Sequence, residues 1–185
     1  MLKRVACLFA LAMFLTAGTA FGQSRPIEFG IDGGITYSML QDMDGMEFDD
    51  ELSFDIPFST LRVGFFVSDN ISVEPQVQFS FFDPGGDSDT QMQLGLLAAV
   101  LYHFQPDMME TQFFVRGGGA FFMYDFGGDV DDTLFGFGGG AGVKVPIADS
   151  FMFRAGGDVV YMLEGDITPA MINIIGSVGV SFFLQ

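Results

Sequence analysis

Nine titratable side chains lie on segments of alternating hydrophobicity, and they are the first candidates for chemistry in this chain. Each occupies a position of opposite parity to the apolar residues around it, so the two sets face opposite sides of a strand. Side chains of both signs on one face can form an ion-pair network or line a path for ions. The nine are Glu28, Asp32, Arg62, Glu74, His103, Arg116, Lys144, Arg154 and Asp158.

The sole histidine, His103, is the natural candidate for a catalytic base. Acyl or glycosyl transfer needs a positioned acid, base or nucleophile. No arrangement of serine, histidine and aspartate can be traced around His103, which precedes a short connection. We favour a satisfied interior histidine over a catalytic one, and we predict no catalytic residue.

Two further motifs suggest a cofactor or a metal. The segment 136–141, GFGGGA, formally matches a dinucleotide fingerprint, but no helix follows it, so we interpret it as a thin-walled strand and expect no cofactor. Asp42, Asp44, Asp129 and Asp131 are weak candidates for calcium or magnesium, which prefer oxygen ligands. The first pair lacks full EF-hand spacing, and solvated acidic loops are the favoured interpretation, so no metal site is predicted.

The elements that position these residues are eight strands. The last is the clearest, because every second residue from Ile172 to Leu184 is apolar or glycine, and the pattern recurs seven times upstream. In the second strand Phe54, Ile56 and Phe58 alternate in the opposite phase to Leu61, which predicts a bulge near 59–60. The predicted strands cover residues 26–39, 54–67, 71–81, 91–104, 112–124, 135–145, 151–161 and 172–184.

The connections between these strands alternate in character. The first, third, fifth and seventh carry most of the acidic residues, and the second, fourth and sixth are mostly shorter. Turns 68–70 and 146–150 are examples of the short type. Because consecutive antiparallel strands alternate in direction, we expect the acidic connections to gather at one end.

The amino terminus predicts export. Lys3 and Arg4 precede an apolar stretch at 5–15 and small residues at 17–22, as in a secretory signal peptide. Cleavage after Ala20 or Gly22 fits, and we favour Gly22. The predicted division is a signal peptide at 1–22 and one β-barrel domain at 23–185.

The composition of the exported part excludes several classes of function. Without Lys3 and Arg4, five of the seven basic residues remain against 24 acidic ones, a formal charge of −19. Binding to nucleic acid needs a basic footprint, so none is expected. The only cysteine, Cys7, lies in the signal segment. No apolar run after the signal is long enough for a spanning helix, so a membrane-spanning form must be a closed barrel.

Two stretches resemble a known family. The sequence 61–66, LRVGFF, before a turn and then 71–75, ISVEP, resembles a hairpin of the small eight-stranded outer-membrane barrels, which include the OmpA transmembrane domain, OmpX and opacity-type porin-like proteins. The ending 179–185, GVSFFLQ, is similar to their assembly signal, although those proteins usually end on an aromatic residue. The resemblance implies an all-β, eight-stranded antiparallel up-and-down transmembrane β-barrel in the outer membrane of a Gram-negative cell.

We therefore expect a non-enzymatic outer-membrane barrel with a plugged polar lumen and acidic extracellular loops, in a structural or surface-interaction role. Its expected partners are outer-membrane lipids, lipopolysaccharide and the barrel assembly machinery, which would recognise the C-terminal strand. We expect a monomer. Because acidic loops repel anionic lipopolysaccharide, weak bridging by divalent ions at the loops is a hypothesis.

Three alternatives differ from this interpretation. A small low-conductance pore would use the same interior charges, but an eight-stranded barrel is only wide enough for its own side chains. An outer-leaflet lipid-modifying enzyme would need a histidine on the loop side. A soluble ligand-binding barrel would have the opposite polarity of its two faces.

Overall fold

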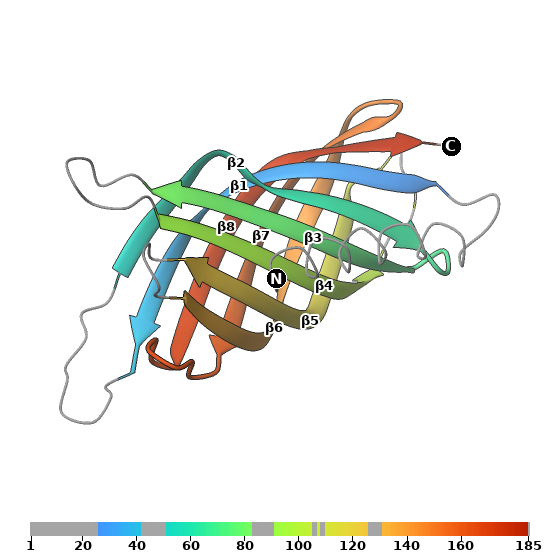
Figure 1. The fold of residues 1–185 in the computed structure, drawn as a ribbon. Helices are drawn as coiled ribbons and strands as arrows, with labels where there is room; N and C mark the ends of the chain where they lie inside the picture. Colours follow the sequence, from blue (N-terminus) through green and yellow to red (C-terminus); the bar gives the residue numbers. More distant parts are fainter. Residues whose placement is uncertain are drawn as a thin grey trace.

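The computed structural model describes residues 26–41, 51–82, 91–104, 107, 110–125 and 131–184. The predicted signal peptide and the loop candidates Asp42, Asp44 and Asp129 lie outside the described residues. Within the described part, no helix is long and apolar enough to cross a membrane. What the structure shows there is a set of eight strands joined in chain order (Figure 1).

All eight strands are long, and their order confirms the predicted fold. Their bounds are β1 (Ile27–Leu40), β2 (Glu51–Phe66), β3 (Ile71–Phe82), β4 (Gln91–His103), β5 (Gln112–Asp125), β6 (Asp131–Ala148), β7 (Phe151–Met162) and β8 (Met171–Leu184).

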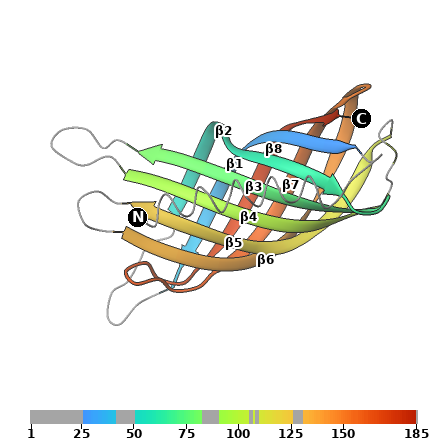
Figure 2. The same cartoon turned by 45° about the vertical axis from the view of Figure 1, so that its right-hand side comes forward.

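The strands close into an antiparallel barrel in which every strand pairs with its neighbours in sequence (Figure 2). The closing seam joins β1 to β8, in register from Ile27 opposite Leu184 to Leu40 opposite Met171. Closure leaves no unpaired sheet edge, which is the condition for a β-structure in lipid.

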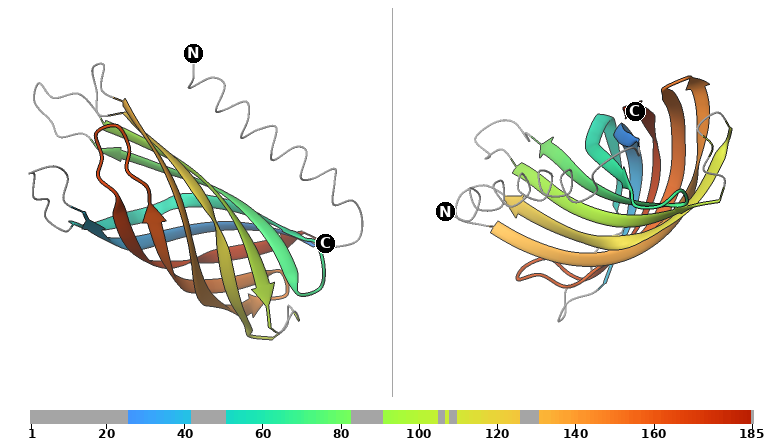
Figure 3. Two further views of the ribbon diagram at one scale, coloured as in Figure 1. Left: turned by 90° about the horizontal axis from the view of Figure 1, so that it is seen from below. Right: turned by 90° about the vertical axis from the view of Figure 1, so that its right-hand side faces the viewer.

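The strand ends gather at the two ends of the barrel (Figure 3). At one end β1, β3, β5 and β7 finish and β2, β4, β6 and β8 begin, and this end is here named the loop end. The opposite end, where β2, β4 and β6 finish, is named the short-turn end, and it includes the described turns 67–70 and 149–150.

The outer wall is apolar and exposed. Phe135, Phe137 and Val178 are 57%, 59% and 55% exposed, although large apolar side chains in a water-soluble protein are mostly buried. The residues at alternate positions of the same strands, such as Leu134 of β6 and Ser181 of β8, are buried on the inner face. Apolar-out and polar-in alternation is the pattern of barrels that lie in lipid.

The predicted bulge in β2 is present. Thr60 pairs with Asp32 of β1, and the next pair toward the loop end is Asp55 with Gly34. Residues 56–59 therefore have only Gly33 opposite them. On the Thr60 side of this irregularity even-numbered residues of β2 pair with even-numbered residues of β1, and on the Asp55 side odd-numbered residues do, which is the change of phase that the sequence predicts.

The prediction of a turn over 146–150 is wrong at its first residues. β6 continues to Ala148, and Pro146 pairs with Met152 of β7 before a register shift. Proline is tolerated at bulges and strand margins because its missing N–H does not interrupt a regular ladder there. The true turn is the pair 149–150.

The first prediction concerns the lipid-facing wall. Val178 lies in the middle of β8, so Val178→Arg is expected to destabilise the barrel by about 2–4 kcal/mol. Ile147, which is 64% exposed near the short-turn end, is the control, because an arginine there is expected to cost about 0–1 kcal/mol. The measurement is urea unfolding in lipid vesicles followed by circular dichroism. Equal losses of stability in the two variants would contradict a lipid-facing wall.

Candidate functional site

The nine residues singled out in the sequence all lie at inward positions. The structure brings eight of them, all except His103, into one network of ion pairs and hydrogen bonds. Half of the network is fully buried: the side chains of Glu28, Arg62, Glu74 and Lys144 have no exposed surface.

Glu28 of β1 is the acceptor at the short-turn side of the network. Its Oε2 lies 2.5 Å from Lys144 Nζ, and its Oε1 lies 2.6 Å from Arg62 Nη1. Ser181 Oγ donates a third hydrogen bond to Oε1 over 2.7 Å. Three donors on one carboxylate compensate the loss of its hydration.

Glu74 of β3 is the second acceptor and connects three arginines. Arg154 Nη1 donates to its Oε2 over 2.6 Å, and Arg62 Nη1 lies 3.4 Å from the same oxygen. Arg116 Nη1 lies 3.7 Å from its Oε1, which also accepts a 3.0 Å bond from Gln76 Nε2. Glu74 thus links strands β2, β3, β5 and β7 across the lumen.

Two bidentate pairs form the side of the network nearer the loop end. Arg62 donates from Nε to Asp32 Oδ2 over 2.6 Å and from Nη2 to Oδ1 over 3.3 Å. Arg116 Nε donates to Asp158 Oδ1 over 2.6 Å, and its Nη2 pairs with Oδ2 of the same carboxylate. Bidentate geometry of this kind is among the strongest pairings available to arginine.

The network balances its charge. Arg62, Arg116, Lys144 and Arg154 face four carboxylates, Glu28, Asp32, Glu74 and Asp158. Removing any single partner would leave a buried charge uncompensated, which is far more costly than the net gain from making the pair.

Aromatic rings cover the network on the short-turn side. Lys144 Nζ lies 5.7 Å from the ring centre of Phe114 and 6.0 Å from those of Phe66 and Phe183. The guanidinium carbon of Arg154 lies 4.5 Å above the ring of Phe114. These cation–π contacts stabilise cations that have left water.

His103 lies among these rings rather than among the ion pairs. Its Nε2 is 2.9 Å from Ser72 Oγ, and its ring stacks on Phe66 with the centres 5.1 Å apart. The histidine is 0% exposed, and in the described part of the chain its Nδ1 has no partner. The described polar contact of its imidazole is therefore a neutral hydroxyl rather than a carboxylate.

Inward-facing glycines give the charged side chains the space they occupy. Gly140 of β6 lies in register between Arg116 of β5 and Asp158 of β7, and those two side chains meet over it. A Cβ at Gly140 would collide with the Asp158 carboxylate, and a Cβ at Gly30 would collide with the guanidinium of Arg62. The glycine-rich segment 136–141 is strand, and Gly136 and Gly140 in it leave room for the side chains of Met162 and Asp158.

Sequence reasoning missed several neutral members of the site. Ser181 donates to Glu28 and accepts from Arg62 Nη2 over 2.7 Å, and Gln76 supports Glu74. Their inward parity was visible in the sequence, but a neutral side chain on the polar face carries no further sign of its role.

The lumen nearer the loop end has different chemistry. Here β5 to β8 contribute a buried apolar cluster that consists of Ala120, Phe122, Leu134, Val160, Met162 and Met171. Asp132 lies beside this cluster and accepts hydrogen bonds from the backbone N–H groups of Thr133, Asp166 and Ile167, which ties residues 163–170 to β6. Among the described residues there is no group of three or more metal-ligating side chains, and Asp131 is described only as the first residue of β6.

A closed barrel with an apolar outer wall and a charged, buried interior defines a transmembrane β-barrel protein. The family model described as "Outer membrane protein beta-barrel domain" matches residues 7–182 of the chain. The chain belongs to this family, and its location is the outer membrane.

Solved structures agree on the fold. Neisserial surface protein A (NspA) is 13% identical with a TM-score of 0.66, and the match covers 86% of this chain and 99% of that one. The outer membrane protein OprG of Pseudomonas aeruginosa is 13% identical with a TM-score of 0.53, covering 89% and 99%. The N-terminal barrel domain of OprF from the same organism is 19% identical with a TM-score of 0.52, covering 86% and 97%. A comparison with curated protein sequences found no match.

The second prediction tests the balance of the network. Arg116→Gln leaves the Asp158 carboxylate, which is 9% exposed, without its bidentate partner, and about 3–5 kcal/mol of stability should be lost. Adding Asp158→Asn removes the stranded charge and should recover part of that loss. Unfolding free energies of the two single variants and the double variant give the coupling. Additive losses would show that the pair is not energetically coupled.

The third prediction tests the space above Gly140. Gly140→Ala should destabilise the barrel by about 1–3 kcal/mol, because the new methyl collides with Asp158 and with the Gly157 carbonyl oxygen. Gly176→Ala is the matched control, since nothing lies within 4 Å of a Cβ there. Both variants are compared by the temperature at which the folded band disappears on unheated-sample gels. Equal disappearance temperatures for the two variants would contradict a steric requirement for glycine at position 140.

Proposed function

We propose that this chain is a non-enzymatic outer-membrane barrel whose lumen is plugged, with a structural or surface-interaction role carried by its acidic loops. The observation that supports a plug is the cross-strand network. Glu28 and Glu74, both fully buried, bind cations from β2, β5, β6 and β7 and so bridge the interior from wall to wall.

The absence of catalysis is part of this proposal. The sole histidine is buried near the short-turn end, bonded to Ser72, and covered by Phe66. Chemistry on outer-leaflet lipids would require groups at the loop end. The lumen nearer the loop end instead contains the apolar cluster around Leu134 and Met162, and the Asp132 carboxylate beside it already accepts backbone hydrogen bonds.

Several further expectations belong to the same proposal. The chain would be exported by a signal peptide at 1–22 and folded as a monomeric barrel at 23–185 by the assembly machinery. Its outer wall would contact membrane lipids, and its acidic loops would lie beside lipopolysaccharide. Weak divalent binding by those loops stays a hypothesis.

The fourth prediction separates a plugged barrel from a pore. Purified protein in planar bilayers should show no steady channel openings, because the ion pairs occupy the path. The variant Glu74→Ala with Arg154→Ala removes two partners at once and should conduct, which shows that the assay can detect an open lumen. Val159→Ala, on the lipid face, is the silent control. Regular openings of the unmodified protein would favour the low-conductance pore.

A further inference from the structure

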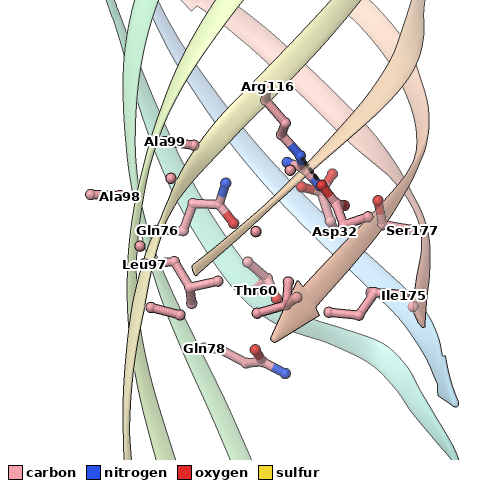
Figure 4. A pocket seen from close by; sticks show the side chains of 18 of the residues that line it. Asp32, Thr60, Gln76, Gln78, Leu97, Ala98, Ala99, Arg116, Ile175 and Ser177 are labelled. Atoms are coloured by element: carbon pink, nitrogen blue, oxygen red, sulfur yellow. Dashed lines mark hydrogen bonds and ion pairs between the residues drawn. The ribbon is translucent and has the colours of Figure 1, made fainter. Parts of the chain in front are cut away.

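A cavity of about 100 Å³ lies in the middle of the lumen, on the loop side of Arg116 (Figure 4). On its short-turn side the network is buried, so any exchange with solvent runs toward the loop end. We name it the mid-lumen cavity. Its lining includes the side chains of Asp32, Thr60, Gln76, Gln78, Leu97, Ala99, Arg116, Ala120, Asp158, Val160, Ile175 and Ser177.

The cavity exists because inward positions around it carry small residues. Gly118 of β5 and Gly138 of β6 face each other in register and contribute no side chain. Ala99, the inward residue next to them on β4, contributes a single methyl. Inward positions nearer the short-turn end carry long charged side chains, which fill the lumen there.

The walls of the cavity have two chemistries. Thr60, Gln76 and Gln78 of β2 and β3 give one polar side. Leu97, Val160 and Ile175 give an apolar side, continuous with the apolar cluster at the loop end. A largely apolar pocket with a few converging polar groups is the usual form of a small-molecule site.

The polar side has free hydrogen-bonding capacity. Within the described chain, the side chains of Thr60, Gln78 and Ser177 make no hydrogen bond to protein. All three are half-buried in the lumen, so water or a ligand in the cavity is the partner available to them. A hydroxyl or amide in the cavity would find a donor and an acceptor in each of the three.

The charges that border the cavity are already compensated. Asp32 accepts two hydrogen bonds from Arg62, and Asp158 is paired with Arg116. A ligand therefore meets no net charge, and an ionic ligand would lose its hydration with nothing to replace it.

We propose that the mid-lumen cavity binds a small neutral amphipathic molecule, with hydroxyl or amide groups toward β2 and β3 and a short hydrocarbon part toward Leu97, Val160 and Ile175. The cavity, at about 100 Å³, is smaller than one of about 150 Å³ that holds benzene, so it holds a molecule of at most about six heavy atoms. This inference goes beyond the proposed function and does not depend on whether the lumen conducts.

The test uses the full barrel in lipid nanodiscs and three probes of similar size. These are 1,2-butanediol, butyrate and 1,4-diaminobutane, which are neutral, anionic and cationic. NMR follows the side-chain amides of Gln76 and Gln78 and the methyl groups of Val160 and Ile175 during each titration. We expect saturable shifts at millimolar diol and none with the two ionic probes.

Two cavity variants and one lipid-face control locate the binding. Ala99→Leu fills the cavity and should weaken diol binding at least tenfold, whereas Ala141→Leu places the same side chain on the lipid face and should leave it unchanged. Thr60→Val keeps the volume but loses the hydroxyl and should weaken binding several-fold, which keeps the test decisive if Ala99→Leu does not fold.

Three results would overturn the proposal. The first is a set of shifts that rise linearly with diol without saturating, with water as the only molecule detected in the cavity. The second is equal saturation by the ionic probes. The third is unchanged diol binding in both Ala99→Leu and Thr60→Val, because the diol would then bind elsewhere on the barrel.

Discussion

The constraint on which the structure depends is that a charge inside a narrow barrel has neither water nor lipid headgroups to stabilise it. Charged side chains must therefore pair with one another, and the pairs must come from different strands. Arg62 meets this requirement most fully, since its guanidinium reaches Glu28, Asp32 and Ser181 at once. These contacts connect β2 to β1 and β8 and thus span the closing seam of the barrel from inside. The contacts that satisfy the charge of Arg62 therefore also hold β1, β2 and β8 together at the closing seam.

The glycines follow from the same constraint. An arginine that crosses the lumen needs the space that a neighbouring side chain would fill, and Gly30 and Gly140 leave that space free. Glycine therefore occupies inward positions beside the most highly charged part of the lumen. Toward the loop end the inward positions combine small residues with a one-sided apolar cluster, and the lumen there contains a cavity instead of ion pairs. Long charged side chains thus fill the lumen toward the short-turn end, whereas small neutral side chains toward the loop end leave the cavity open.

Much of the fold could be predicted because strand periodicity and the exclusion of charge from lipid act locally in the sequence. Eight strands, their order and even the bulge before Thr60 followed from alternation alone. The partners within the site could not be predicted, because they depend on the stagger of neighbouring strands. Arg116 lies four residues after the first residue of β5 and Asp158 seven after the first residue of β7, yet both lie beside Gly140 and pair with each other. Pro146 shows the opposite failure, since a residue that usually ends a strand was accommodated by a bulge.

The charges of the lumen are balanced in sign, whereas those outside the lumen are mostly acidic. The interior network holds four bases and four acids, so it contributes no net charge. Four of the five basic residues after position 22 are used there, and almost the whole excess of acid lies outside the network. The field that a molecule meets on approaching the barrel therefore comes from the loop end and the rims rather than from the lumen. With the binding proposed for the mid-lumen cavity, a neutral interior beneath acidic loops would disfavour anions at the surface and any ion at the cavity.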